Sequence, residues 1–312
     1  MVARGRNVTG LELKEAYKHA AMYLEGNIDE LNAMNVFPVP DGDTGINMFL
    51  TMKSAVAATE KSSDATVAAI SSTAARGALL GARGNSGVIL SQILKGIAKG
   101  LEGKDTFSFN DFTAALHIAS EQAYHVVAEP VEGTILTVIR EVSEAALQAG
   151  ERHISFTRMI MSLVSQAKKT VIKTPELLPV LKDSGVVDSG AKGLYYVFVG
   201  MRDAICREKI SARNSGSSLS LATSTEEETA YGFDLQFMIE GEKLPLEEIR
   251  DKVTMFGGCP LVVGDDTLIR VHVHTLVPDD VLEYARSKGV LVDIKIENMD
   301  QQVQKRNMEK LR

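Results

Sequence analysis

Two aspartates, Asp41 and Asp43, stand in the segment PVPDGDTG, where proline and glycine residues favour a turn. An aspartate in such a turn can cap the helix that follows, by accepting hydrogen bonds from its first backbone N–H groups. The same two carboxylates are hard oxygen ligands of the kind that Mg²⁺ takes, one or two at a time, beside phosphate groups. The segment therefore has two interpretations, a helix cap and a magnesium site.

Three further breaks carry glycine and polar residues where a simple connector would need neither. They are ARGNSG at 82–87, EGT at 132–134 and VDSGAKG at 187–193. Each opens a segment of helical periodicity, so its free N–H groups and the positive end of the helix dipole can receive a phosphate, with Ser86 as an extra donor. Taken singly, each is an ordinary helix start. A metal beside phosphate-binding groups is what phosphoryl transfer requires, and the absence of GxxxxGK[ST] excludes a P-loop.

Helical periodicity continues through the first two thirds of the chain, and no stretch there alternates for long enough to form a sheet. The spacing predicts an all-α domain over residues 1–210. Its eight helices are expected at 11–34, 46–60, 65–80, 87–100, 110–128, 134–148, 155–172 and 190–206, with a short helical turn near 176–182. The four breaks follow the first, third, fifth and seventh helices. In an up-and-down bundle they meet at one end, which favours a shared site.

The character of the sequence changes after a Ser/Thr-rich linker at 211–229. Residues 230–303 predict a smaller α+β domain in which strands and helices follow the order β-α-β-β-α-β, the split-βαβ sandwich. The expected elements lie at 231–241, 244–258, 259–266, 267–276, 278–289 and 290–299. Residues 304–312 are expected to form a polar tail or the stub of a helix.

The strand RVHVHT places His272 and His274 two residues apart, so both imidazoles emerge on one face of the sheet. Together with Cys259 on the preceding strand or Asp234 on the first strand, they could form a Zn²⁺ site. The alternative is a pair of half-exposed strand histidines. Cys206 falls in the other domain, so a disulfide with Cys259 is not expected.

Composition limits the partners. The net charge is −7 and no cluster of Lys and Arg is apparent, which argues against a nucleic-acid scaffold. No run of about 18 apolar residues marks a membrane span, and no apolar segment follows the N-terminus as in a signal peptide. We therefore expect a cytoplasmic protein.

Four ordered motifs, NVFPVPDGDTGINM, ARGNSGVILSQ, EGTILTVIRE and DSGVVDSGAKGL, resemble the dihydroxyacetone kinase L-subunit (DAK2) family over about residues 10–206. The branch they resemble is the catalytic subunit of bacterial fatty acid kinase. The resemblance implies an eight-helix antiparallel barrel that binds ATP or ADP with Mg²⁺ at one end, where Asp41 and Asp43 hold the metal and form the catalytic centre. The residues expected at the nucleotide are Thr44, Gly45, Asn47, Gly84, Asn85, Ser86, Gly87, Thr134, Asp188, Ser189 and Gly190.

Two departures from the family pattern bear on activity. Some dihydroxyacetone kinases have a third acid upstream of the aspartate pair, where the nearest polar residue in this chain is Asn35. Ile46 replaces the threonine of DGDTGTN and removes a hydroxyl near the phosphates. These changes leave open a second hypothesis, a nucleotide-sensing scaffold that binds ATP or ADP and regulates a partner without turnover.

The segments GDDTLIRVHVHT and VDIKIENM are similar to the middle domain of the same catalytic chain, in which a Cys and two His bind zinc. This chain has Asp234 at the position of that Cys, so Asp234 or Cys259 is expected to join His272 and His274 if zinc is held. The family's longer members continue into a third domain that engages the acyl-carrying protein. The chain ends soon after VDIKIENM, so it is either a short member or lacks that domain.

The resemblance thus implies an ATP- and Mg²⁺-dependent kinase, a homodimer, that phosphorylates a fatty acid carboxylate presented by a separate fatty-acid-binding protein. A kinase for a small hydroxylated molecule such as a triose remains an alternative acceptor hypothesis.

Overall fold

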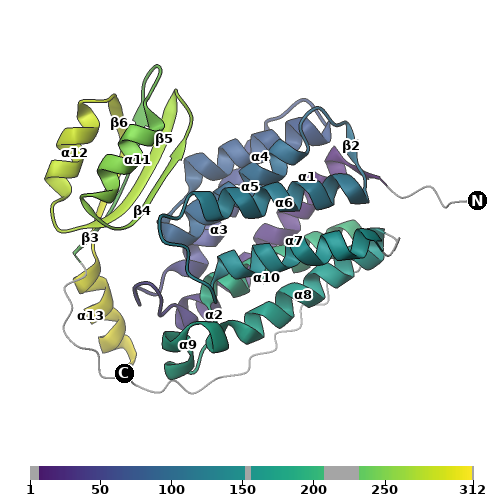
Figure 1. Ribbon diagram of the computed structural model, residues 1–312, viewed down its shortest axis with the longest axis horizontal. Coiled ribbons are helices and arrows are strands. Elements are labelled where there is room, and N and C mark those ends of the chain that lie inside the picture. Colours follow the sequence, from purple (N-terminus) through teal and green to yellow (C-terminus); the bar gives the residue numbers. More distant parts are fainter. Residues whose placement is uncertain (1–6, 152–155, 207–231, 311–312) are drawn as a thin grey trace, which may run out of the picture.

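The computed structural model describes residues 7–151, 156–206 and 232–310, and shows a helical domain beside a smaller sheet domain (Figure 1). The mostly helical first part and the smaller α+β part confirm the predicted fold class at that level. The predicted linker, 211–229, lies outside the described residues.

The helical domain contains a set of long helices that pack in sequence order. Each one from α3 to α8 packs on the next, and α10 packs on both α8 and α1, which in turn packs on α3. The helices are α1 (Gly10–Glu25), α2 (Ile28–Met34), α3 (Thr44–Glu60), α4 (Val67–Gly81), α5 (Gly84–Gly100), α6 (Phe109–His125), α7 (Ile135–Glu151), α8 (Phe156–Leu177), α9 (Pro179–Asp183) and α10 (Ser189–Cys206). Their apolar faces form one core.

Two predictions for this domain were wrong in detail. The expected helix at 11–34 is broken into α1 and α2 at Gly26 and Asn27, where the Asn27 side chain donates to the carbonyl of Tyr23 at 2.6 Å. The apolar pattern continues across this break and conceals it. The domain also contains a two-residue ladder, too short for a period to be detected, in which β1 (Val8–Thr9) pairs with β2 (Thr106–Phe107).

The second domain contains the six predicted elements in the predicted order. They are β3 (Phe233–Glu240), α11 (Leu246–Thr254), β4 (Gly257–Gly264), β5 (Leu268–Thr275), α12 (Pro278–Arg286) and β6 (Val290–Asn298). The strands form one antiparallel sheet in the order β4-β5-β3-β6. A further helix, α13 (Met299–Lys310), occupies most of the predicted polar tail.

The side chains on the two faces of β5 pack against different parts of the protein. Ile269, Val271 and Val273 join the core beneath α11 and α12. The alternate positions include Arg270 and His272, which are also buried although they lie on the opposite face. That face is covered by the helical domain, so the whole strand is buried on both sides.

Three contacts fix the sheet on the helical domain. Arg270 reaches the end of α4, where its Nε donates to the carbonyl of Leu79 at 2.8 Å and its Nη2 to that of Leu80 at 2.7 Å. Leu261 and Val263 of β4 belong to the apolar core of the helical domain. Met299 and Val303 of α13 pack on Val39, just before the aspartate turn. The sheet domain therefore closes over one end of the helical domain.

Candidate functional site

A cavity of about 580 Å³ lies where the two domains meet. All four glycine-bearing breaks contribute to its wall, which confirms that they meet at one end of the helical domain. Its polar and small lining residues are Asn35, Asp41, Asp43, Thr44, Gly84, Asn85, Ser86, Glu129, Thr134, Asp188, Ser189, Gly190, Asp234, Thr254, Gly257, Gly258, Cys259, His272 and His274. Most of the predicted nucleotide residues and all the predicted zinc ligands thus face a single cavity, which the sequence did not reveal.

Three predicted nucleotide residues support the wall from behind and do not line it. The Gly45 N–H donates to Oδ1 of Asn32 at 2.8 Å. A Cβ at Gly84, where φ is +56°, would lie 2.5 Å from the Asn47 amide nitrogen, and one at Gly87 would lie 2.4 Å from the Thr51 hydroxyl. Gly84 and Gly87 therefore allow α5 to approach Asn47 and Thr51 of α3, and Gly45 allows α3 to approach α2.

The structure contradicts the helix-cap interpretation of the aspartate turn, because the Asp43 carboxylate is hydrogen-bonded to the side chains of Asn47 and Asp41. Asp43 occupies the N-cap position of α3, yet its side chain makes no capping hydrogen bond there. The first N–H groups of α3 are instead satisfied by asparagines: Asn35 Oδ1 accepts from the Thr44 N–H at 3.0 Å and also from the Thr44 hydroxyl. Asn35 also donates to the carbonyl of Val39 at 2.8 Å, so its amide serves the fold.

Burial raises the pKa of Asp41 well above its ordinary value, and the neighbouring Asp43 raises it further. Burial also raises the pKa of Asp43, to which the charge of Asp234 contributes. The two carboxyl groups are coupled, because the Asp43 charge raises the pKa of Asp41 while a hydrogen bond from Asp41 lowers the pKa of Asp43, so a state with both groups ionised is costly. A divalent cation would remove this penalty, and carboxylate oxygens are the ligands that Mg²⁺ prefers.

The N-terminus of α5 presents donors to the cavity beside these acids. The first backbone N–H of α5 that makes a helical hydrogen bond is that of Gly87, which donates to the carbonyl of Arg83 at 3.0 Å. The N–H of Gly84 is taken by the Gln236 side chain at 3.2 Å. The N–H groups of Asn85 and Ser86 belong to the first turn, which has no intrahelical acceptors, so they are available to an anion.

Asp188 joins two other helix starts. Its carboxylate accepts from the Ala191 N–H of α10 at 2.6 Å and from the Ile135 N–H of α7. Burial raises its pKa to about 7, although both hydrogen bonds favour the ionised form. Thr134 also caps α7, because its hydroxyl accepts from the Leu136 N–H at 3.3 Å. Both side chains thus hold the wall in shape.

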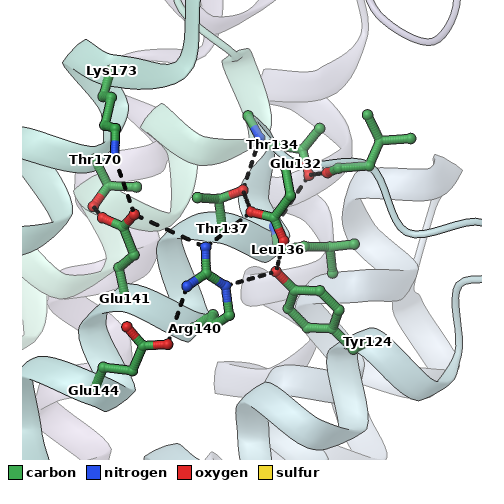
Figure 2. A network of polar contacts seen from close by, with 12 residues as sticks. Tyr124, Glu132, Thr134, Leu136, Thr137, Arg140, Glu141, Glu144, Thr170 and Lys173 are labelled. Carbon is green, nitrogen blue, oxygen red and sulfur yellow. Dashed lines mark hydrogen bonds and ion pairs between the residues drawn. The ribbon is translucent and has the colours of Figure 1, made fainter. Parts of the chain in front are cut away.

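A polar network behind the third break was missed at the level of sequence (Figure 2). Thr137 accepts from the Gly133 N–H and donates to Glu132, at 2.8 and 2.7 Å. Arg140 and Tyr124 donate to the same Glu132 carboxylate at 3.0 and 2.7 Å. Because Glu132 precedes Gly133 and Thr134, this network fixes the turn that lines the cavity. Its members lie on α6, on α7 and in the turn between them, and no sequence spacing marks them as a group.

The sheet contributes a cluster of three metal-ligand side chains. One ligand atom each from Asp234, His272 and His274 lies within 4.8 Å of the others. His272 Nδ1 lies 3.1 Å from Asp234 Oδ1, but neither atom, nor Nε2 of His272, has a hydrogen bond of acceptable geometry in the described residues. His272 is only 1% exposed. Buried polar atoms that face one another without hydrogen bonds are suited to bind a cation.

The protonation states in this cluster also fit a metal. Burial, helped by the neighbouring His272, lowers the pKa of His274 to about 4, so its imidazole is neutral at pH 7 as a ligand must be. Burial alone would raise the pKa of Asp234, but the His272 imidazole outweighs it and the net shift is downward. Two imidazoles and one carboxylate form a donor set that zinc accepts, with a position open to the cavity.

The alternative in which Cys259 completes this cluster is wrong for the described geometry. Cys259 is exposed on the rim of the cavity and lies outside the three-residue group. It has a φ of +49° and stands at the irregular part of β4 between Gly258 and Leu261. Neither Cys206 nor Cys259 forms a disulfide.

Comparison with known proteins assigns both domains. Residues 38–203 match the model of the DAK2 domain. The chain belongs to the DAK2 domain family. Residues 230–306 match the FakA-like middle domain of fatty acid kinase, so both parts of this DAK2 protein are kinase-related.

Its relatives are longer. The chain is 38% identical to protein YloV of Bacillus subtilis over 95% of its own length and 56% of that protein. It is 37% identical, over the same shares, to a Staphylococcus saprophyticus protein described as uncharacterized. The chain therefore spans about half the length of the curated relatives it matches.

Among solved structures, the dihydroxyacetone kinase of C. freundii is similar over 65% of this chain and 36% of that one, with 15% identity and a TM-score of 0.46. No helix in the described ranges is long and apolar enough to cross a membrane.

Proposed function

We propose that this DAK2 protein is an ATP- and Mg²⁺-dependent phosphotransferase whose nucleotide lies in the cavity between the domains. The observation that carries this proposal is the pair of neighbouring carboxylates, Asp41 and Asp43, which do not cap α3 and which line the same cavity as the free N–H groups of α5. A helix cap needs neither a second acid nor a cavity. A magnesium nucleotide needs carboxylates that bind the metal and N–H donors that bind the phosphates, close together.

In this proposal each part of the wall has a distinct task. Asp41 and Asp43 would hold Mg²⁺, which when bound neutralises charge on the phosphates. The N–H groups of Asn85 and Ser86 would hold phosphate oxygens, and Ser189, at the start of α10, lies on the same wall. Asp188, which caps two helices, would keep that wall rigid.

The reaction needs no covalent enzyme intermediate. An oxygen of the acceptor would form a bond to the γ-phosphorus of ATP as the bond between that phosphorus and the β,γ-bridging oxygen breaks. The bonding electrons leave with ADP. Positioning and charge neutralisation account for most catalysis of this kind.

For the acceptor, we propose a fatty acid carboxylate presented by a separate acyl-binding protein, because the second domain matches the fatty acid kinase middle domain. A triose-type hydroxyl acceptor is the alternative. Ile46, which replaces a threonine of the family pattern, is half-buried against the helical core and is absent from the cavity lining. The lost hydroxyl is therefore a weak argument against turnover.

We also propose that Asp234, His272 and His274 hold Zn²⁺ in the same cavity. The unpartnered buried atoms of His272 and Asp234 support this assignment. A homodimer and a cytoplasmic location remain proposals that rest on the family resemblance.

The decisive test is calorimetric titration of ATP, with and without Mg²⁺, into the wild type and the Asp41→Ala/Asp43→Ala variant. We expect micromolar binding that requires Mg²⁺ and is lost in the variant. The control is Asp251→Ala/Asp280→Ala, which removes two exposed acids of the second domain and should bind as the wild type does. No binding by the folded wild type would overturn the proposal.

A second experiment separates the kinase from a nucleotide sensor. ADP formation is measured with ATP alone, with added oleate and with added dihydroxyacetone. Stimulation by oleate supports the fatty acid assignment, and stimulation by dihydroxyacetone supports the triose alternative. If ATP binds but is not turned over with either acceptor, nor with an acyl-loaded binding protein, the sensor is favoured.

A further inference from the structure

A chain of polar contacts crosses the boundary between the two domains and joins the two halves of the site. The Gly84 N–H at the start of α5 donates to Oε1 of Gln236 at 3.2 Å. Nε2 of the same amide donates to Oδ2 of Asp234 at 2.7 Å. The other oxygen of Asp234 lies 3.1 Å from Nδ1 of His272. A phosphate-binding helix end and a candidate metal ligand thus share one glutamine.

The whole chain of contacts is buried, so solvent does not compete for it. Gln236 and Asp234 are each 6% exposed, and Gly84 is buried. Gln236 lies on β3, directly opposite His272 on β5 and two residues after Asp234, on the same face of the sheet. An irregular step in the pairing with β6 follows it. Its place is therefore set by the sheet and not by the helical domain.

The chemistry of the link requires a carboxamide. Gln236 accepts at one end and donates at the other, which neither a glutamate nor an aliphatic side chain can do. If the amide of Gln236 were rotated by half a turn, the Gly84 N–H would face an NH₂ group and Asp234 would face a carbonyl oxygen. Asp234 therefore sets the orientation of Gln236, and Gln236 sets the position of the first turn of α5.

We infer that Gln236 is a positioning residue that couples metal binding at Asp234, His272 and His274 to nucleotide binding at α5. A metal on the free oxygen of Asp234 fixes this carboxylate, so its second oxygen holds the Gln236 amide in the orientation that accepts from Gly84. The N–H groups of Asn85 and Ser86 are then already in place for phosphate. This inference rests on the proposed nucleotide and zinc sites.

Coupling of this kind is reciprocal: zinc strengthens ATP binding by the same factor as ATP strengthens zinc binding. Part of it will be direct, because a bound cation attracts the phosphates through space. The part carried by Gln236 disappears when the amide is removed and the metal ligands are kept. This difference isolates the link from simple charge attraction.

The experiment compares wild type with Gln236→Leu, each stripped of zinc by a chelator that spares Mg²⁺ and then reloaded with Zn²⁺. ATP affinity with Mg²⁺ is measured calorimetrically in both states. For the wild type we expect zinc to tighten ATP binding about tenfold, a typical size for coupling between sites. In Gln236→Leu, measured at a zinc concentration that saturates the site because loss of the hydrogen bond to Asp234 weakens zinc binding, we expect at most about a twofold effect of zinc on ATP affinity.

Two further variants sharpen the result. Gln301→Leu, the same change at an exposed glutamine on α13, should keep the full coupling. Gln236→Met keeps the length of the side chain but has no donor for Asp234, so it should behave like Gln236→Leu. Amide hydrogen exchange gives a second readout: zinc should slow exchange at Gly84 in the wild type and not in Gln236→Leu.

The outcomes distinguish the possible failures. If the folded wild type binds no ATP, the proposed function fails and the coupling with it. If ATP binds but Zn²⁺ does not, the metal assignment fails and so does the coupling. If both bind and zinc leaves ATP affinity unchanged, or Gln236→Leu keeps the full effect, only the coupling is overturned.

Discussion

The helical and sheet walls of the cavity treat their buried acids in opposite ways. On the helical wall, burial raises the pKa values of Asp41, Asp43 and Asp188, and the described residues supply no cation against them. On the sheet wall, the His272 imidazole holds the pKa of Asp234 below its ordinary value. The raised pKa values on the helical wall suit a cation that binds together with the nucleotide. The lowered pKa of Asp234 on the sheet wall suits a metal that remains bound without it.

The largest expected effect tests whether the two walls bind different metals. Asp234→Ala should weaken zinc binding about 100-fold or more, because it removes a ligand, while ATP binding with Mg²⁺ remains measurable. Asp41→Ala/Asp43→Ala should abolish Mg²⁺-dependent ATP binding, while zinc binding remains measurable. Zinc is measured by competition with a chromophoric chelator, and ATP by calorimetry.

His117→Ala, which removes an exposed histidine of α6, is the control and should change neither affinity. If one variant abolished both affinities while remaining folded, the two walls would form a single metal site and the comparison would fail.

The pH dependence of stability should also differ between the walls in the metal-free protein. His274 has a folded pKa of about 4, below its unfolded value of about 6.5, so its contribution is complete above pH 6.5 and is lost as pH falls. Asp188 has a folded pKa of about 7, above its ordinary value, so its contribution is greatest at low pH and is lost as pH rises towards 7.

Urea unfolding at pH 7 and pH 5 separates these contributions. On going from pH 7 to pH 5, the free energy of unfolding of His274→Gln should gain about 2 kcal/mol relative to wild type. That of Asp188→Asn should lose about 2 kcal/mol relative to wild type. Equal pH dependence in all three proteins would contradict both assignments.

The smallest expected effect concerns the contact that keeps the two walls together. Arg270 is 2% exposed and donates to the last carbonyls of α4. Arg270→Met keeps the apolar stem but leaves those carbonyls unpaired, so we expect a loss of about 1.5 kcal/mol in urea unfolding. Arg286→Met, at an exposed position of α12, is the matched control, and an equal loss there would contradict this role for Arg270.

Local patterns predicted most of the elements well. The six elements of the second domain and the long helices were found within a few residues, because apolar periodicity reports which face of an element is buried. The break between α1 and α2 was missed, since the periodicity continues through a change in direction. The ladder of β1 and β2 was missed because two residues contain no period.

The sequence by itself determined that four breaks share one end of a helical domain, and that His272 and His274 share one face of a strand. The first follows from the number of helices between the breaks, and the second follows from the two-residue spacing of the histidines. Tertiary structure alone decided that these two ends form one cavity, that Asn35 and not Asp43 caps α3, and that Gln236 links the walls. Contacts between residues 152 positions apart depend on how two domains dock, and no local pattern encodes this.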